Sequence, residues 1–405
     1  MNILICLIGS NPLPNYIVTK YALLDKTQRQ NDWEKIPVPD KVLFLHSKDT
    51  EDIADNIIKK LDVKFKSIIY KISLGDNQRS KEYIRKSLIN ALDKEEKITS
   101  IHLNYTGGTK PMSVHSYDTI YKYFKDKDEN FELITSDLDP KEYRIQINGK
   151  EKYPSNSDLR QFVTLGIKTL LELHGMTFEK SEGKKINSKD LNIDLETFKN
   201  NYIKMTEDRN KIKQFREVVS RLDDSKEASK RDELDFINDF NKLCGKELES
   251  LSSGTTKFKY MVKFAGGHWL EEYIQNKLMS VKDKYELSEA KRSVEASYDK
   301  RKCELDVVVN KGYEMHLFTC TTSSHIQTVK GKAFEGMYRA SQLAGDQAKT
   351  IIVHLMPRKG TQVSTEEQLK NDLSSFNAKH TTYSICLDDI KDNNKLDKKL
   401  SEIFS

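Results

Sequence analysis

The chain has 405 residues, of which 37% are hydrophobic and 32% charged, and its formal net charge is +5. This length predicts two or three domains, and the apolar content is sufficient for packed cores, so wholesale disorder is excluded. The mild basicity permits a polyanionic partner such as a nucleic acid but does not require one.

The five cysteines are scattered along the chain and form no Cys-x-x-Cys pair. That pattern argues against a disulfide scaffold and a zinc ribbon, and it fits the reducing cytoplasm, where we expect the protein to reside. The longest apolar runs, Ile3–Ile8 and Ile351–Met356, are far shorter than the roughly 20 residues that span a bilayer. No basic segment precedes the first run, so we expect neither a signal peptide nor a membrane partner.

Residues 1–152 alternate between apolar strand patterns and amphipathic helical patterns. The predicted strands are Ile3–Ile8, Val42–His46, Ser67–Ile72, Ile101–Tyr105 and Phe131–Thr135. The predicted helices include Thr50–Leu61, Lys81–Leu92 and Met112–Phe124. Near-continuous apolar strands between such helices predict an α/β domain with a parallel sheet covered on both faces.

Two loops of this domain follow predicted strands, Gly9–Pro14 after the first and Thr106–Lys110 after the fourth. Ligands of open parallel sheets bind outside the carboxyl ends of the strands, which is where both loops lie in the predicted sheet. The sequence therefore predicts a ligand site at this edge.

Residues 153–256 have a different composition. Tyr153–Ser157 reads as a linker, and Leu251–Thr256 as a second boundary. Between them lie helical stretches dense in charged residues, for example Phe198–Leu222 and Lys230–Leu243. We predict a mostly helical connecting domain whose charge runs form a solvated surface.

Residues 257–405 form a third region with an α/β pattern. Its predicted elements are a helix at Gly267–Leu278, a hairpin of Glu304–Val309 and Glu314–Thr321 joined by a turn, a helix at Lys332–Leu343 and a strand at Thr350–Leu355.

The loop between the fourth strand and its helix carries the chemistry of a phosphate site. It contains Gly107 and Gly108, which permit close backbone approach or positive φ, and Pro111 suits the first turn of the following helix. The helix N-terminus supplies free N–H groups and a positive dipole end, to which Lys110 adds a cation. It is neither a Walker A loop nor a dinucleotide fingerprint, and a plain tight turn is the alternative.

These two loops resemble those of a CARF domain, the Rossmann-like sensor of type III CRISPR immunity. The resemblance lies in the Ile8–Asn11 stretch and in the Asn104–Lys110 loop. It implies a homodimer that binds a cyclic oligoadenylate across its two-fold axis. By the same family resemblance, the expected ligand is cyclic tetra-adenylate. The residues that it assigns to the ring are Ser10, Asn11, Thr106, Gly107, Gly108, Thr109 and Lys110.

Two C-terminal stretches, Gly266–Tyr273 and Cys303–Val309, resemble the PD-(D/E)xK nuclease domain of Card and Can effectors, a restriction-endonuclease-like α/β fold. The resemblance implies Mg²⁺ or Mn²⁺ held by Asp306 and Glu271, hard ions that favour oxygen ligands. Glu304 lies two residues before Asp306 on the same strand face and is a further catalytic candidate, and Glu272 is the alternative to Glu271 in register. A carboxylate at Asp306, within an apolar strand, would be costly without a function.

The next strand departs from the family pattern. Thr319 and Thr321 stand where the family has the glutamate and the lysine of its Glu-x-Lys motif. Either Lys330 or Lys332 supplies the missing cation, or the nuclease is degenerate. His316, His325 and His354 are conceivable bases, but we expect ordinary strand or loop histidines.

The sequence thus predicts a cyclic oligoadenylate-activated, metal-dependent nuclease that cuts DNA, RNA or both. Basic stretches such as Lys300–Lys302 and Lys330–Lys332 either bind the phosphates of the nucleic acid or form solvated turns. The alternative is a sensor whose nuclease-like domain binds nucleic acid or a partner without cutting. A third possibility is that the sensor domain cleaves its own ligand.

Overall fold

The computed structural model describes residues 1–29, 36–125, 131–139, 144–147, 159–181, 187–224, 228–248, 255–299, 301–344, 348–358, 369, 371–372 and 382–404. These form two compact units, Met1–Thr177 and Phe178–Ser405. The predicted linker Tyr153–Ser157 and most of the predicted boundary at Leu251–Thr256 lie outside the described residues.

The first unit contains a six-stranded sheet of order β3-β2-β1-β4-β5-β6, in which only β6 runs antiparallel to its neighbour. Its strands are β1 (Asn2–Leu7), β2 (Lys41–His46), β3 (Ile69–Ser73), β4 (Ser100–Asn104), β5 (Glu132–Asp139) and β6 (Arg144–Ile147). Its helices are α1 (Leu13–Ala22), α2 (Glu51–Lys60), α3 (Lys81–Leu92), α4 (Lys110–Lys125) and α5 (Ile167–Leu173), with short 3-10 turns at Lys26–Gln28, Lys48–Thr50, Val63–Ile68 and Leu159–Gln161.

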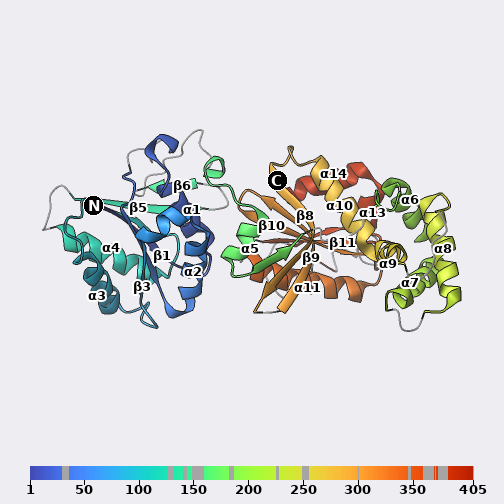
Figure 1. Cartoon of the computed structure of the whole chain (residues 1–405), viewed down its shortest axis with the longest axis horizontal. Helices are drawn as coiled ribbons and strands as arrows, with labels where there is room; N and C mark the ends of the chain where they lie inside the picture. Colours follow the sequence, from blue (N-terminus) through green and yellow to red (C-terminus); the bar gives the residue numbers. More distant parts are fainter. Residues whose placement is uncertain are drawn as a thin grey trace. The chain divides into compact units, whose positions relative to one another are not determined.

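Helices cover both faces of this sheet, α3 and α4 on one side and α1 and α2 on the other (Figure 1). On the α3–α4 side, Ile5 and Leu103 pack with Leu88 and Ile120 in one core. Their strands are buried on both faces, which explains why they read as near-continuous apolar runs. The predicted α/β class and parallel sheet are confirmed, and the antiparallel edge strand β6 is an addition that four residues were too few to predict.

The second unit contains a mixed sheet of order β12-β11-β10-β9-β8-β7. Its strands are β7 (Thr177–Lys180), β8 (Leu287–Tyr298), β9 (Arg301–Lys311), β10 (Glu314–Thr321), β11 (Lys349–His354) and β12 (Thr382–Ile385). Its helices are α6 (Leu195–Met205), α7 (Arg209–Asp224), α8 (Lys230–Cys244), α9 (Thr256–Lys263), the π turn η6 (Phe264–His268), α10 (Trp269–Ser280), α11 (Ile326–Ala344), α13 (Leu387–Lys391) and α14 (Asn393–Phe404).

The β8–β9–β10 strands are antiparallel, and β10, β11 and β12 run parallel. One face of this sheet packs on α10 and α14, and α11 covers the other (Figure 1). Successive side chains of β11 point to opposite faces of the sheet. Ile351 and Val353 belong to the core on the α10 face, and Ile352 belongs to the core on the α11 face.

Helices α6 to α8, which lie in the predicted connecting domain, share one hydrophobic core with the α10 face of the sheet. Phe198 and Phe240 belong to the same cluster as Trp269 and Phe318. The predicted helix Phe198–Leu222 is in fact two helices, α6 and α7. The chain turns between them, and the Asp208 side chain accepts N–H groups from the first turn of α7. The predicted domain boundaries after residues 152 and 256 stay predictions.

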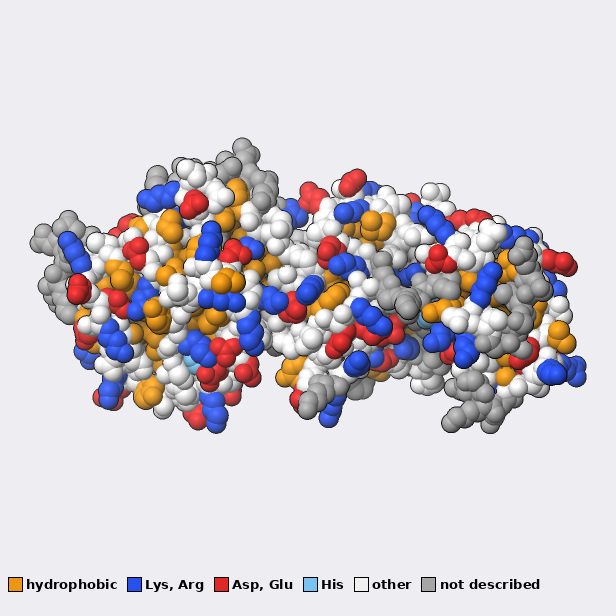
Figure 2. Space-filling model, in the orientation of Figure 1, with side chains coloured by type: hydrophobic (Ala, Val, Ile, Leu, Met, Phe, Trp, Pro, Cys, Tyr) orange, Lys and Arg blue, Asp and Glu red, His pale blue; other side chains and the backbone are white. Residues whose placement is uncertain are grey.

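Strand β8 is one of the two longest elements that the sequence did not predict, with α14, also of 12 residues, as the other. In β8, Ser288–Arg292 is polar except for Ala290, so this strand lacks the apolar run that predicted the others. None of the helices in the described part of the chain is long and apolar enough to cross a membrane. Basic and acidic side chains intermingle over the face shown in Figure 2, as expected of a solvated surface.

Buried histidines make the fold sensitive to acid. Burial lowers the pKa of His102 to about 3, that of His316 to about 3 and that of His174 to about 4. A base with a depressed folded pKa is neutral when folded but gains a proton on unfolding below pH ~6.5. Its stabilising contribution is therefore complete above that pH and is lost as the pH falls toward 3.

We expect His102→Gln to reduce the loss of unfolding free energy between pH 7.5 and 5.0 by about 2 kcal/mol, because one proton-linked group is removed. Urea denaturation followed by circular dichroism at the two pH values measures this difference. An equal loss in the variant and the wild type would contradict the prediction.

Candidate functional site

The two loops predicted to bind a ligand lie against each other at the carboxyl ends of β1 and β4. A Cβ atom on Gly107 would lie 2.2 Å from the carbonyl oxygen of Leu7, and one on Gly9 would lie 2.8 Å from the backbone nitrogen of Gly108. Gly108 also adopts a left-handed φ of 73°. The glycines are therefore required for contact between the loops, in addition to any approach of a ligand.

A chain of buried amide and hydroxyl hydrogen bonds ties the loops to three elements. Asn15 on α1 donates to the carbonyl of Leu7 (2.8 Å) and accepts from Asn104 (2.8 Å). Asn104 in turn accepts from the Thr106 hydroxyl (2.8 Å), and that hydroxyl accepts the N–H of Leu138 on β5 (2.7 Å). Asn15 and Asn104 are completely buried, so these bonds fix the edge of the sheet without using exposed groups.

The predicted ligand residues divide into two kinds. Ser10, Thr109 and Lys110 are exposed, and Asn11 is half-buried with its side chain accepting the N–H of Leu13 (3.0 Å). Thr109 caps α4, since its carbonyl accepts the N–H of Ser113 (3.0 Å). Thr106, Gly107 and Gly108 build the loop, Thr109 and Lys110 lie at the N-terminus of α4, and Ser10 lies in the loop after β1.

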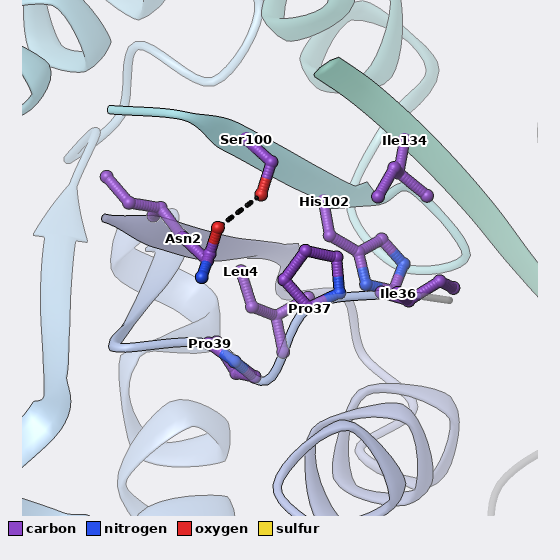
Figure 3. Close-up of a pocket in the computed structure, with 9 residues that line it drawn as sticks. Asn2, Leu4, Ile36, Pro37, Pro39, Ser100, His102 and Ile134 are labelled. Atoms are coloured by element: carbon purple, nitrogen blue, oxygen red, sulfur yellow. Dashed lines mark hydrogen bonds between the residues drawn. The ribbon is translucent and has the colours of Figure 1, made fainter. Parts of the chain in front are cut away.

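A small pocket lies toward the opposite, amino ends of β1 and β4 (Figure 3). Its lining comprises Asn2, Ile3, Leu4, Ile36, Pro37, Pro39, Ser100, His102 and Ile134. Its polar groups bond one another, with the Ser100 hydroxyl donating to Asn2 (2.9 Å) and His102 bonded to Ser136 (2.7 Å). It is separate from the loop edge.

In the second unit, Asp306 lies where the β9–β10 ladder ends. The last ladder pair joins Val307 to Phe318, and beyond it the Asp306 carboxylate accepts the N–H of Cys320 (2.7 Å). Burial, with the charges of Asp306 and Glu271, raises the pKa of the Cys320 thiol well above its usual value. The charges of Asp306 and Glu271 thus both act on the Cys320 thiol.

The carboxyl group of Asp306 has a raised pKa, chiefly because it is buried, and Glu304 adds to the rise. The Cys320 N–H and the charges of Lys332 and Arg339 act in the opposite direction. A carboxyl that burial pushes toward its neutral form favours a nearby cation. Arg339 was not among the predicted residues, because only the register of α11 places it near Asp306.

The two alternatives in register, Glu271 and Glu272, differ in their hydrogen-bond partners. Glu272 accepts the hydroxyl of Ser188 (2.6 Å) and forms a buried ion pair with Arg292 (3.2 Å). Glu271 instead accepts the hydroxyl of Ser293 (3.4 Å). Glu272 is therefore held in buried structural contacts, and Glu271 stays the candidate for the helix carboxylate.

The threonines in place of the Glu-x-Lys motif take structural roles. A Cβ on Gly336 of α11 would lie 2.7 Å from the Thr319 hydroxyl, so the helix packs directly on this side chain. Thr321 accepts the N–H of Ser323 (3.2 Å) at the end of β10. Glu304 is exposed, and its carbonyl accepts a bond from Arg339.

The two candidate replacement lysines differ in their partners. Lys330 forms an ion pair with Asp372. Lys332 pairs with Glu335 on the same helix (3.1 Å), and its charge acts on Asp306. Lys332 is therefore the better placed of the two.

The contacts described for the three histidines involve neither Asp306 nor Glu271. His316 is buried against Phe404, with ring centroids 4.9 Å apart. His354 bonds the Ser384 hydroxyl (2.9 Å), and His325 is exposed. Within the described residues, no group of three or more His, Cys, Asp or Glu side chains is arranged to hold a metal ion.

The architecture defines an α/β protein with a Rossmann-like N-terminal sheet, a helical middle and a mixed C-terminal sheet. Residues 3–161 match the sequence model of the Card1 CARF domain, so the chain contains a CARF domain, as the loop motifs predicted. No curated protein sequence matches the chain.

Two solved structures share this fold over the whole chain. Can2 from Sulfobacillus thermosulfidooxidans, determined in complex with cyclic tetra-adenylate, is 16% identical with a TM-score of 0.67, and each chain is covered completely. Protein VC1899 from Vibrio cholerae is 14% identical with a TM-score of 0.64, over 100% of this chain and 98% of that one. The predicted fold class is confirmed.

We expect Gly107→Ala to cost about 3 kcal/mol of unfolding free energy, because the new methyl group meets a backbone carbonyl that cannot move aside. Gly75→Ala is the matched control, since Gly75 has a φ of 55° but open space around it. Its cost should be only about 1 kcal/mol. Urea denaturation of the two variants measures the difference, and equal costs would rule out the close approach of the loops.

Proposed function

We propose that this protein is a homodimeric, cyclic oligoadenylate-activated nuclease of type III CRISPR defence that uses Mg²⁺ or Mn²⁺ to cut DNA, RNA or both. The observation that carries the proposal is the loop pair at the carboxyl edge of the N-terminal sheet. Buried bonds hold these loops in place and leave Thr109 and Lys110 exposed at a helix N-terminus and Ser10 exposed in the loop after β1.

The chemistry of this edge suits a cyclic polyanion. Free N–H groups at the start of α4 and the Lys110 ammonium favour phosphate, and the hydroxyls of Ser10 and Thr109 add donors. The solved Can2 structure of the same fold contains cyclic tetra-adenylate. We therefore propose cyclic tetra-adenylate as the activator.

A second copy of the chain would complete the site. The helix that begins at Lys110 carries an exposed apolar stripe of Val114, Tyr117 and Tyr121, with exposed fractions of 63%, 46% and 47%. The two tyrosine rings are stacked with centroids 6.1 Å apart. This stripe continues directly from the ligand edge, so a second α4 packed on it would place two edges around one symmetric ring.

We expect calorimetric titration with cyclic tetra-adenylate to give one ligand for every two chains. Lys110→Ala should weaken binding about 10- to 100-fold, the loss typical of a charge-assisted contact. Lys122→Ala is the matched control, because this lysine lies on the same helix and pairs with Asp118 (2.7 Å). One ligand per chain would contradict the shared site, and equal affinities of the two variants would contradict the role of Lys110.

The C-terminal site fits a divalent metal ion in its donor set. Asp306 and Glu271 supply two carboxylates, and Mg²⁺ is commonly bound by one or two carboxylates and several waters. Such an ion would activate a water molecule and offset charge on the scissile phosphate. Asp306 and Glu271 would hold the ion, and the Cys320 N–H would orient the Asp306 carboxylate.

Lys332 would supply the cation that the Glu-x-Lys lysine provides in the family. Its charge already acts on Asp306 from α11, together with that of Arg339. A cation beside the reacting phosphate stabilises negative charge that develops during cleavage.

The second candidate function is a sensor whose nuclease-like unit binds nucleic acid or a partner without cutting it. The packing of Thr319 under Gly336 favours this alternative, because a structural contact occupies the position of the family glutamate.

We expect ligand-dependent cleavage of plasmid DNA, single-stranded DNA or RNA in Mn²⁺, lost in Asp306→Ala. Lys332→Ala should slow cleavage about 10- to 100-fold, while Lys330→Ala should cut at the wild-type rate because Lys330 is paired with Asp372. A wild-type protein that binds cyclic tetra-adenylate and cuts none of the three substrates would establish the non-cutting alternative.

A further inference from the structure

Ser293, in the middle of β8, has a backbone conformation that a strand does not provide. Its φ is 51°, in the left-handed region, although it is neither glycine nor part of a turn. Such a conformation is costly for a residue with a Cβ and persists only where surrounding contacts impose it. Only 3% of Ser293 is exposed, so the distortion is not a surface irregularity.

The distortion changes which way the side chain points. In a regular strand, Arg292 and Ser293 would face opposite sides of the sheet. Here both reach the same helix, α10, where Arg292 pairs with Glu272 (3.2 Å) and the Ser293 hydroxyl donates to Glu271 (3.4 Å). Two consecutive strand residues therefore hold two consecutive carboxylates.

The position of Ser293 along the strand links it to the other carboxylate. The ladder pairs on either side of it place Ser293 opposite Asp306 on β9. The strained residue thus lies between the two side chains proposed to hold the metal ion, and it donates to one of them. It is absent from the motifs by which the nuclease resemblance was recognised.

We propose that Ser293 is a positioning residue, whose left-handed backbone directs its hydroxyl to Glu271 and orients that carboxylate toward Asp306 for divalent-metal binding. The inference rests on the proposed function and names a residue that acts through Glu271. Hydrogen-bond partners of metal ligands orient the ligands, and their loss commonly weakens metal binding about 10- to 100-fold.

The left-handed backbone at Ser293 can be tested by comparing the melting temperatures of two variants, because it reverses their usual order in a strand. Ser293→Gly and Ser293→Ala both remove the hydroxyl, but only glycine accepts the left-handed φ without strain. We expect the glycine variant to melt about 2–4 °C above the alanine variant in the absence of metal. In a regular strand glycine would be the less stable of the two, and that order would overturn the proposal.

The functional part is tested by calorimetric titration of the full chain with MnCl₂. Both variants should bind Mn²⁺ at least about 10-fold more weakly than the wild type, despite their different melting temperatures. A merely structural role would change stability but leave this affinity unchanged. Ser288→Ala is the matched control, because Ser288 lies on the same strand and donates to Asn310 (2.9 Å), away from the carboxylates.

The outcomes separate this inference from the proposed function. Wild-type affinity in both Ser293 variants would overturn the inference and leave the metal site standing. A wild-type protein that takes up no Mn²⁺ would overturn the metal-dependent function, and the positioning role with it. Weakened binding in Ser288→Ala as well would show a general effect of β8 and would also overturn the role of Ser293.

Discussion

The bond between the Asp306 carboxylate and the N–H of Cys320 is the contact around which the C-terminal unit is organised. Beyond the last ladder pair of β9 and β10, this side chain bonds the backbone N–H of the neighbouring strand. A charged acceptor in a partly buried position is tolerated because it is hydrogen-bonded and lies near cations from α11. The same arrangement leaves a carboxylate at the point where the β9–β10 ladder ends while β9 stays paired with β8.

In the N-terminal unit, neutral side chains hydrogen-bond to the backbone in a similar way at the carboxyl ends of the strands. Side-chain amides of Asn15 and Asn104, instead of backbone alone, join the ends of β1, β4 and β5. Buried amides satisfied by one another specify a single arrangement of the loops, because each misplaced member would leave an unpaired polar group. Both candidate sites therefore depend on buried side chains that bond the backbone, with the exposed residues placed by them.

The sequence predicted those features that depend on neighbouring residues along the chain. Apolar runs predicted strands β1, β2, β4 and β11 to within a residue or two, and glycine-rich loops indicated the ligand edge. The decision between Glu271 and Glu272 was beyond the sequence, because neighbouring carboxylates on a helix differ only in their tertiary partners. The contribution of Arg339 depends on helix register, and the strained φ of Ser293 on contacts between elements. Strand β8 escaped prediction because its pattern is polar.

The close packing of α11 on β10 bears on how easily the family motif could return. A Cβ on Gly336 would lie only 2.7 Å from the Thr319 hydroxyl, so the helix packs closely on this side chain. A glutamate at position 319 would need new space, and any larger residue at position 336 would close it further. The two positions are therefore coupled, and restoring the family motif by one substitution would meet a steric barrier.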